Sequence, residues 1–155
     1  MTIVRKLLVF IVAAFYLTAC AKQAPSNTSK SASLSSINKQ WELNGHRVEV
    51  VLEESDTTKA LLTILPDEFA MTELHKNEKY YTLPKSVPTK EARVETIEAG
   101  DVMVYGNNTL VVFYRTFPTN YSYTRIGRIK NEGNLAELLG EGDIKVTLRR
   151  DERKE

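Results

Sequence analysis

From Gln40 onward the chain is a succession of short apolar segments, each ended by a turn signal. In most of them Val, Ile, Leu, Tyr or Phe alternates with polar residues, which is typical of strands that bury one face. The first two segments are separated by Asn44-Gly45, a pair favoured in two-residue hairpin turns because both positions need positive φ. No long amphipathic helical pattern interrupts the series. We therefore predict a mostly β domain.

The middle of the series predicts a buried hairpin. Residues 102–105 and 109–114 are apolar runs on either side of the turn Gly106-Asn107-Asn108. The second run is apolar at consecutive positions, which is typical of a strand covered on both faces, so we expect it to be central in the sheet. The same reasoning predicts further strands at 40–43, 47–52, 69–74, 79–83, 94–97, 121–129 and 144–148.

Two short helices are predicted between the strands. Ser55 or Asp56 can cap a helix over residues 58–65 that Pro66 stops, and residues 135–139 form a second helix before Gly140. We expect the first helix to plug the open end of a sheet or barrel.

Closure of the strands into a barrel removes the exposed sheet edges that so many short strands would otherwise leave. The predicted fold is a closed β-barrel of about eight strands with two short helices, over residues 39–148. Residues 149–155 form a charged tail.

The first twenty residues have a different character. Arg5 and Lys6 precede an apolar run at 7–17 that is short for a permanent membrane-spanning helix, so residues 1–19 are predicted to be a signal peptide. Leu17-Thr18-Ala19-Cys20 resembles the lipobox of bacterial lipoproteins. That resemblance implies cleavage before Cys20 and acylation of its sulfur and of the new amino terminus. Several acyl chains give durable anchoring in a lipid bilayer.

Residues 20–38 are predicted to be the lipidated cysteine and a flexible tether, because they are rich in Ser, Asn and Lys and lack aromatic residues. The expected location is the cell envelope. The residue after Cys20 is Ala21 and not aspartate, which favours the outer membrane facing the periplasm in a bacterium with two membranes, and otherwise the outer face of the plasma membrane. The competing interpretation is an incidental thiol in a signal peptide or membrane anchor.

Composition argues against several classes of function. The chain has 21 basic and 20 acidic residues, and removing Arg5 and Lys6 with the leader leaves 19 basic residues, so we expect no nucleic-acid partner. Cys20 is the only cysteine, which leaves no thiol in the domain for a disulfide, a zinc site or a nucleophile. His46 and His75 lie beside turns and lack neighbouring ligands. We predict no metal and no cofactor.

The domain resembles the cyclophilin-like family, relatives of the cyclophilin prolyl isomerases with a compact barrel. The resemblance covers residues 40–148. It depends on the order and spacing of five segments: Trp41 with Asn44-Gly45, Thr57-Thr58-Lys59-Ala60-Leu61-Leu62 leading to Leu65-Pro66, Ala99-Gly100-Asp101, Leu110-Val111-Val112-Phe113-Tyr114, and Arg125-Ile126-Gly127-Arg128-Ile129.

The resemblance also implies where an isomerase would carry its site. Phe113 matches the phenylalanine of the isomerase groove, but Val111 stands where those enzymes have glutamine, and the only tryptophan, Trp41, is far upstream. The segment 69–83, which matches the strand of the catalytic arginine, contains no arginine. Lowering an amide rotation barrier of roughly 18–20 kcal/mol needs a fixed polarising group. We therefore expect no catalysis.

A ligand groove remains possible on the strand faces. Phe113 and Arg115 share one face by period-two geometry, as do Tyr121, Tyr123 and Arg125. Guanidinium groups beside aromatic rings would suit an anionic or amphipathic ligand. In the competing interpretation, the rings pack in the core or at the rim of the barrel and the arginines are solvated surface charges. The predicted groove comprises Met103, Tyr105, Phe113, Arg115, Tyr121, Tyr123 and Arg125.

The sequence thus predicts a membrane-anchored lipoprotein that binds a small ligand or an envelope protein without catalysis. One alternative is a divergent peptidyl-prolyl cis-trans isomerase. Another is a structural subunit of an envelope complex.

Overall fold

The computed structural model describes residues 36–130 and 133–149. The predicted signal peptide, Cys20, residues 21–35 of the predicted tether and residues 150–155 of the predicted tail lie outside these ranges. The first strand begins at Ser36, so the barrel domain starts before the predicted boundary at residue 39. None of the helices within the described ranges has the length and apolar character needed to cross a bilayer.

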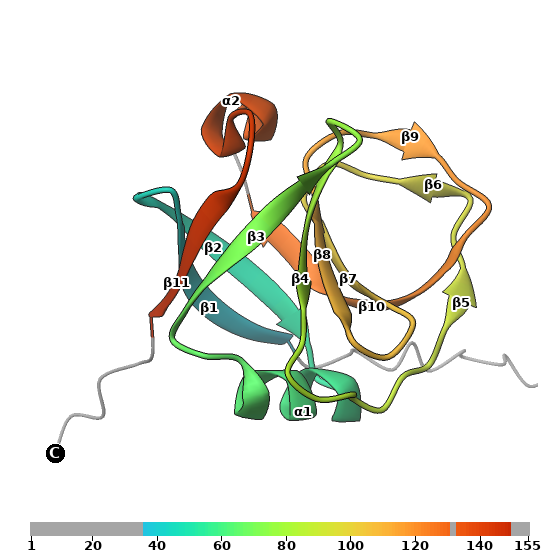
Figure 1. Ribbon diagram of the computed structural model, residues 1–155. Helices are drawn as coiled ribbons and strands as arrows, with labels where there is room; N and C mark the ends of the chain where they lie inside the picture. The colour runs from blue at the N-terminus through green and yellow to red at the C-terminus, as the bar shows by residue number, and fades with distance from the viewer. Residues whose placement is uncertain (1–35, 131–132, 150–155) are drawn as a thin grey trace, which may run out of the picture. The chain divides into compact units, whose positions relative to one another are not determined.

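Eight antiparallel strands close into a barrel in the order β2-β1-β11-β3-β4-β8-β7-β10, and β10 pairs with β2 to complete it (Figure 1). This confirms the predicted mostly β fold with a closed barrel of about eight strands. The barrel strands are β1 (Ser36–Leu43), β2 (His46–Glu53), β3 (Glu68–Leu74), β4 (Glu78–Thr82), β7 (Asp101–Tyr105), β8 (Thr109–Phe113), β10 (Ser122–Lys130) and β11 (Ile144–Arg149).

The first hairpin forms as its sequence predicts. Asn44 and Gly45 connect β1 to β2 with φ values of 49° and 83°, the left-handed conformations that a tight hairpin turn requires. Asn44 also contacts the neighbouring strand β11, because its side-chain oxygen accepts a hydrogen bond from the Lys145 amide at 3.0 Å. The turn therefore determines the register of two strand pairs.

Two short helices lie at opposite ends of the barrel (Figure 1). Helix α1 (Asp56–Ile64) begins two residues before the predicted start, because the Ser55 hydroxyl accepts the Thr58 amide hydrogen at 3.1 Å and caps the first turn. Leu61 on its inner face is fully buried. Helix α2 (Leu135–Leu139) has the predicted bounds and ends at Gly140, whose φ is 61°.

Barrel closure depends on one glycine in β10. Gly127 pairs with Leu52 of β2, and a Cβ atom at position 127 would lie 2.2 Å from the Val51 carbonyl oxygen. A side chain at this position would therefore push the two strands apart. The register of β10 against β7 also shifts between Arg125 and Gly127, so the strand bends where it closes the barrel.

The barrel has one core inside and a second apolar cluster outside. Val112 of β8 belongs to the interior core, whereas Val111 and Phe113 on the opposite face of the same strand belong to the outer cluster. The strand is therefore covered on both faces, as predicted. Its outer cover includes the two-residue strands β6 (Thr96–Ile97) and β9 (Phe117–Pro118), which pair with each other. A third two-residue strand, β5 (Ala92–Arg93), pairs with β10.

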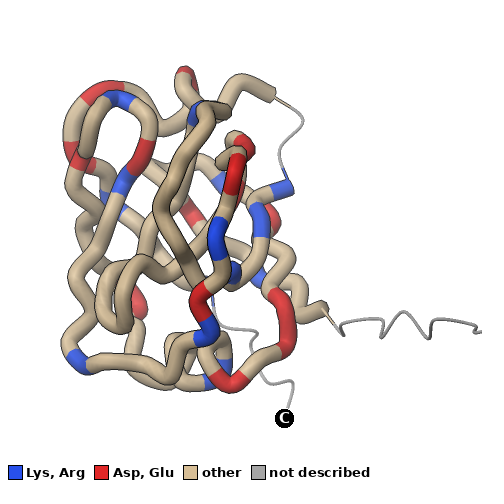
Figure 2. The backbone as a smooth tube through the Cα atoms, turned by 90° about the vertical axis from the view of Figure 1, so that its right-hand side faces the viewer, with Lys and Arg blue, Asp and Glu red and all other residues tan. Residues whose placement is uncertain are grey.

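The sequence prediction was incomplete for this outer layer. One strand over residues 94–97 was expected, but the structure has two separate two-residue strands in this region, β5 and β6. Strand β9 was not predicted. Over the view of Figure 2, acidic and basic positions are interspersed along the backbone and do not form a field of one sign.

Candidate functional site

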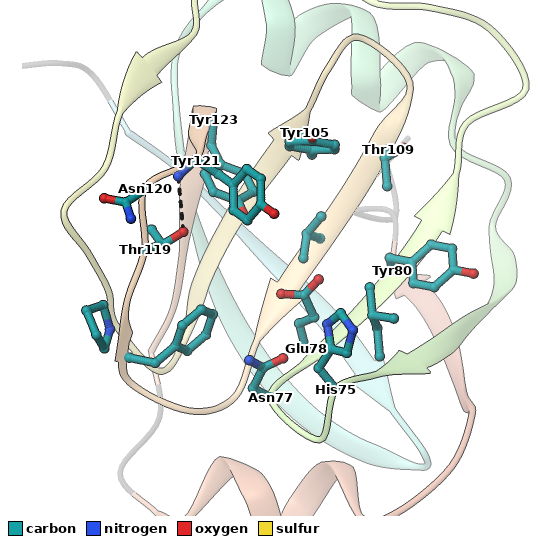
Figure 3. Close-up of a pocket in the computed structure, with 14 residues that line it drawn as sticks. His75, Asn77, Glu78, Tyr80, Tyr105, Thr109, Thr119, Asn120, Tyr121 and Tyr123 are labelled. Atoms are coloured by element: carbon teal, nitrogen blue, oxygen red, sulfur yellow. Dashed lines mark hydrogen bonds between the residues drawn. The ribbon is translucent and has the colours of Figure 1, made fainter.

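A pocket of about 740 Å³ opens on the outer face of the barrel, beside the layer formed by β6 and β9 (Figure 3). Its wall combines strand residues of β4, β7, β8 and β10 with the β3–β4 turn and the segment after β9. The lining residues are Leu74, His75, Asn77, Glu78, Tyr80, Tyr105, Thr109, Val111, Phe117, Pro118, Thr119, Asn120, Tyr121 and Tyr123.

Strand alternation decides which side chains reach this pocket. In β4, Glu78 and Tyr80 point outward and line it, whereas Lys79 and Tyr81 point into the barrel interior. Tyr80 pairs with Val111 of β8, so an aromatic ring and a branched apolar side chain form adjacent parts of the pocket floor. The two neighbouring tyrosines therefore face opposite sides of the sheet.

Three tyrosines form the upper wall of the pocket in the view of Figure 3. The Tyr105 ring lies edge-on to Tyr121, with centroids 6.0 Å apart and an interplanar angle of 86°, and it is tilted by 52° to Tyr123 at 5.5 Å. Tyr105 and Tyr121 are 46% and 62% exposed, whereas Tyr123 is buried against Phe113. Burial, reinforced by the charge of Glu78, raises the pKa of Tyr123 to about 12, so this hydroxyl stays neutral at physiological pH.

The opposite end of the pocket is acidic. Figure 3 shows the Glu78 carboxylate pointing from the start of β4 toward the tyrosine rings. Burial raises the pKa of Glu78, and the nearby charge of Glu73 adds to this effect while that of His75 opposes it. Within residues 36–130 and 133–149, the Glu78 carboxylate accepts no hydrogen bond and forms no ion pair. It is thus a partly desolvated acid that faces an open space.

The turn before Glu78 has a constrained backbone. His75 and Lys76 have φ values of 54° and 57°, in the left-handed region that non-glycine residues seldom adopt, and the Asn77 amide donates to the Leu74 carbonyl at 3.3 Å. The side-chain oxygen of Asn77 is buried and has no hydrogen-bond partner among the described residues. Buried acceptors are usually paired, so this oxygen is a second unsatisfied acceptor beside the carboxylate.

The structure brings together some of the predicted groove residues and separates the others. Tyr105, Tyr121 and Tyr123 line the pocket. Met103 and Phe113 are fully buried in the outer cluster behind it, and so they support the pocket wall but do not contact its contents.

The two predicted arginines have other partners. Arg115 donates from Nε to the Lys76 carbonyl at 2.9 Å, and Arg125 donates from Nη1 to the buried Asp101 carboxylate at 2.8 Å. Neither arginine is a lining residue. The geometry therefore does not provide the pair of guanidinium groups that an anionic ligand was expected to contact.

Sequence reasoning missed the acidic end of the site. Neither Glu78 nor Asn77 was singled out from the sequence, and His75 was placed only beside a turn; His75 is exposed there but also lines the pocket. The period-two pattern of β4 was the available signal, since it places Glu78 on the same face as Tyr80. No group of three or more His, Cys, Asp or Glu side chains in the described parts of the chain is placed to hold a metal ion.

Comparison with known proteins agrees with this fold. A family model described as the Cyclophilin-like family matches residues 41–149, which span the barrel from β1 to β11. The solution structure of a hypothetical protein from Archaeoglobus fulgidus is similar with a TM-score of 0.56 and 20% sequence identity, and the alignment covers 78% of this chain and 99% of that one. At that identity the likeness concerns the fold alone. No curated protein matches this chain in sequence.

Proposed function

The chain belongs to the cyclophilin-like family, and from this premise we propose that it is a lipid-anchored binding protein of the cell envelope whose outer pocket holds a small ligand or a segment of a partner protein. The proposal depends above all on one observation. Tyr105 and Tyr121 are the exposed large hydrophobic residues of the described ranges, and both line the same pocket. Apolar side chains exposed together at a cavity are typical of binding sites.

The size and lining of the pocket support a ligand of drug-like dimensions. Ligand pockets are commonly 300–1,000 Å³, mostly apolar, with a few polar groups that orient the ligand. This pocket has about 740 Å³, aromatic walls and a carboxylate at one end. Met103 and Phe113 are buried behind the wall, so the exposed rings rest on a packed support. A preformed wall of this kind lowers the entropy cost of binding.

Anchoring is proposed from the sequence of the leader. The lipobox-like segment that ends at Cys20 would attach the protein to a membrane through acyl chains, with residues 21–35 between the anchor and the barrel. In this arrangement the pocket would work at the surface of that membrane, in the periplasm or outside the cell.

The prolyl isomerase alternative is less favoured by the chemistry of the pocket. An isomerase needs a group that polarises the amide as its double-bond character is lost. The pocket instead has the Glu78 carboxylate, and Val111 occupies the floor where the resemblance implies glutamine. The full chain should therefore leave the cis/trans relaxation of a proline peptide at its uncatalysed rate. Acceleration at micromolar protein would establish the isomerase instead.

Binding can be tested with a neutral aromatic probe. We expect indole-3-ethanol to bind the full chain, purified in dodecyl maltoside, with saturable one-to-one stoichiometry in calorimetric titration. Tyr121→Ala should weaken this binding by about tenfold, because a ring contact contributes on the order of 1 kcal/mol. Tyr121→Phe, the matched control, keeps the ring and should bind nearly as well as the natural chain.

Absence of saturable binding would refute the proposed pocket function. In that case, co-purification of one stoichiometric protein with the anchored chain would favour the structural-subunit alternative.

A further inference from the structure

The pocket has an acidic electrostatic character. Apart from its tyrosines, its ionisable lining residues are Glu78 and His75, and no lysine or arginine of the described ranges lines it. Glu78 is half-buried, whereas His75 is exposed at the turn. A carboxylate held in a partly desolvated site attracts a positive charge more strongly than one in bulk water. The charge of the lining therefore favours a cationic ligand.

Two basic residues near the acidic end of the pocket, Lys79 and Arg115, are directed elsewhere, and Lys76 of the β3–β4 turn is not a lining residue. Lys79 is fully buried on the other face of β4, where its Nζ atom donates to Glu73 and to the carbonyl oxygens of Gly140 and Gly142. Arg115 donates to the backbone carbonyl of Lys76. These bonds hold both cations away from the pocket, so no lysine or arginine of residues 36–130 and 133–149 forms an ion pair with Glu78, and His75 is the one other charged group that acts on it among the lining residues.

The aromatic wall has the geometry that organic cations prefer. Tyr121 lies at a right angle to Tyr105 and Tyr123 at an oblique angle to it, so a ligand in the pocket meets rings that differ in orientation. The face of an aromatic ring attracts ammonium groups through its quadrupole, and cages of several rings recognise quaternary ammonium ligands. Tyr121 is mostly exposed, and its hydroxyl end points toward the cavity in Figure 3.

The polar groups at the acidic end are acceptors in need of a donor. The Glu78 carboxylate has no hydrogen-bond or ion-pair partner within the described ranges, and the Asn77 side-chain oxygen next to it is buried and unpaired. A protonated amine has several N–H donors and a positive charge, and so it could satisfy such acceptors. An anion would leave them unpaired and would be repelled.

We propose that the pocket takes an organic cation, a protonated or quaternary amine carried on a flat apolar body. The amine lies at the Glu78 end, and the apolar body lies against the tyrosine wall. This assignment rests on the proposed binding function and names the ligand class of the same site.

The test uses three indoles that share a ring and differ in charge. Tryptamine is positively charged at neutral pH, indole-3-ethanol is neutral and indole-3-acetate is negatively charged. Each is titrated into the full chain in dodecyl maltoside by calorimetry. We expect tryptamine to bind about tenfold more tightly than indole-3-ethanol, because a cation–π contact beside a carboxylate contributes about that much affinity. We expect indole-3-acetate to bind most weakly.

A substitution assigns the preference to the carboxylate. Glu78→Gln keeps the size and shape of the side chain, and so it should reduce the preference for tryptamine to less than about threefold without weakening indole-3-ethanol. Glu68→Gln is the matched control, because Glu68 lies on β3 outside the lining and its ion pair with Lys145 is exposed. It should leave all three affinities unchanged.

Each outcome is decisive. Equal binding of the three indoles, or tightest binding of indole-3-acetate, overturns the cation assignment but leaves the binding function standing. Binding of none of them refutes the binding function itself. A tryptamine preference that survives in a folded Glu78→Gln variant shows that another group attracts the cation, and so it overturns the assignment to this site.

Discussion

The Lys79 ammonium group lies 2.5 Å from a carboxylate oxygen of Glu73 and is completely excluded from solvent. Tyr114 donates its hydroxyl to the same carboxylate, and its ring lies 5.1 Å from Lys79 Nζ. The lysine also donates to the Gly140 and Gly142 carbonyls, which lie between α2 and β11. This buried network therefore joins β4 to the segment that closes one end of the barrel.

Replacing the buried lysine should be costly. Lys79→Met leaves the Glu73 charge without its cation and two glycine carbonyls without their donor, so we expect the free energy of unfolding to fall by about 3 kcal/mol. Urea denaturation of the full chain measures this change. Lys145→Met, which removes an exposed pair with Glu68, is the control and should cost less than about 1 kcal/mol. Equal effects of the two substitutions would contradict a structural role for the buried network.

The same network should make stability depend on pH in the acid range. Burial opposes ionisation of Glu73, but hydrogen bonds from Lys79 and Tyr114 outweigh it and lower the pKa of Glu73 below its ordinary value of 4.5. A lowered folded-state pKa stabilises the protein above the ordinary value, and this contribution is lost as pH falls through the lowered pKa. The stability difference between the natural chain and Glu73→Gln should therefore be constant above about pH 5 and shrink below pH 4.

Glu78 should show the opposite dependence. Burial raises the pKa of Glu78, so the ionised carboxylate is disfavoured in the folded state. The ionised carboxylate therefore destabilises the folded protein above the raised pKa, and this effect disappears when the group is protonated. Glu78→Gln should therefore raise the melting temperature at pH 7, on the order of 2 °C, and have little effect at pH 4. Differential scanning calorimetry at the two pH values tests this. A lower melting temperature of the variant at pH 7 would show that the carboxylate stabilises the fold.

The β10–β2 seam should not accept a side chain at position 127. Gly127→Ala would place a Cβ atom against the Val51 carbonyl, so we expect a loss of about 2–3 kcal/mol in the free energy of unfolding. Gly106→Ala is the matched control, because nothing lies within 4 Å of its Cβ position, and only its positive φ of 56° is strained. That strain should cost about 1 kcal/mol. Chemical denaturation compares the two variants, and equal losses would mean that the seam relaxes.

Membrane attachment should depend on a single sulfur atom. Cys20→Ser removes the thiol that acylation requires, so we expect the protein to leave the membrane fraction and appear in the soluble fraction. Intact-mass analysis of the natural product should show a chain that starts at Cys20 and carries acyl groups. An unmodified thiol with the leader still attached would contradict the lipoprotein prediction.

Local features of the fold could be predicted because they depend on neighbouring residues. The turn at Asn44-Gly45 follows from the conformations that these two residues tolerate, and the bounds of α2 follow from Gly140 at its end. Each of these signals acts over a few residues, so no knowledge of the tertiary structure was needed.

The candidate site could be predicted only in part. Tyr105, Tyr121 and Tyr123 were expected near one opening, and all three line the pocket. Arg125 does not face the pocket, because it pairs with Asp101, a buried carboxylate on the neighbouring strand β7. The outer layer beside the pocket consists of β6 and β9. Strands of two residues are too short to show a period in the sequence, so this layer and the pocket beside it could not be foreseen.

The sequence by itself determined the alternating strands, their turns, the helix caps and the barrel that they favour, because these depend on interactions within a hairpin or a helical turn. Only the tertiary structure decided that Lys79 bonds to residues 61 and 63 positions away, and that Glu78 faces an open cavity that no lysine or arginine of the described residues lines. The reason is physical: the partner of a charged side chain is chosen by how distant strands meet once the barrel closes. Local sequence contains no information about which distant strands become neighbours.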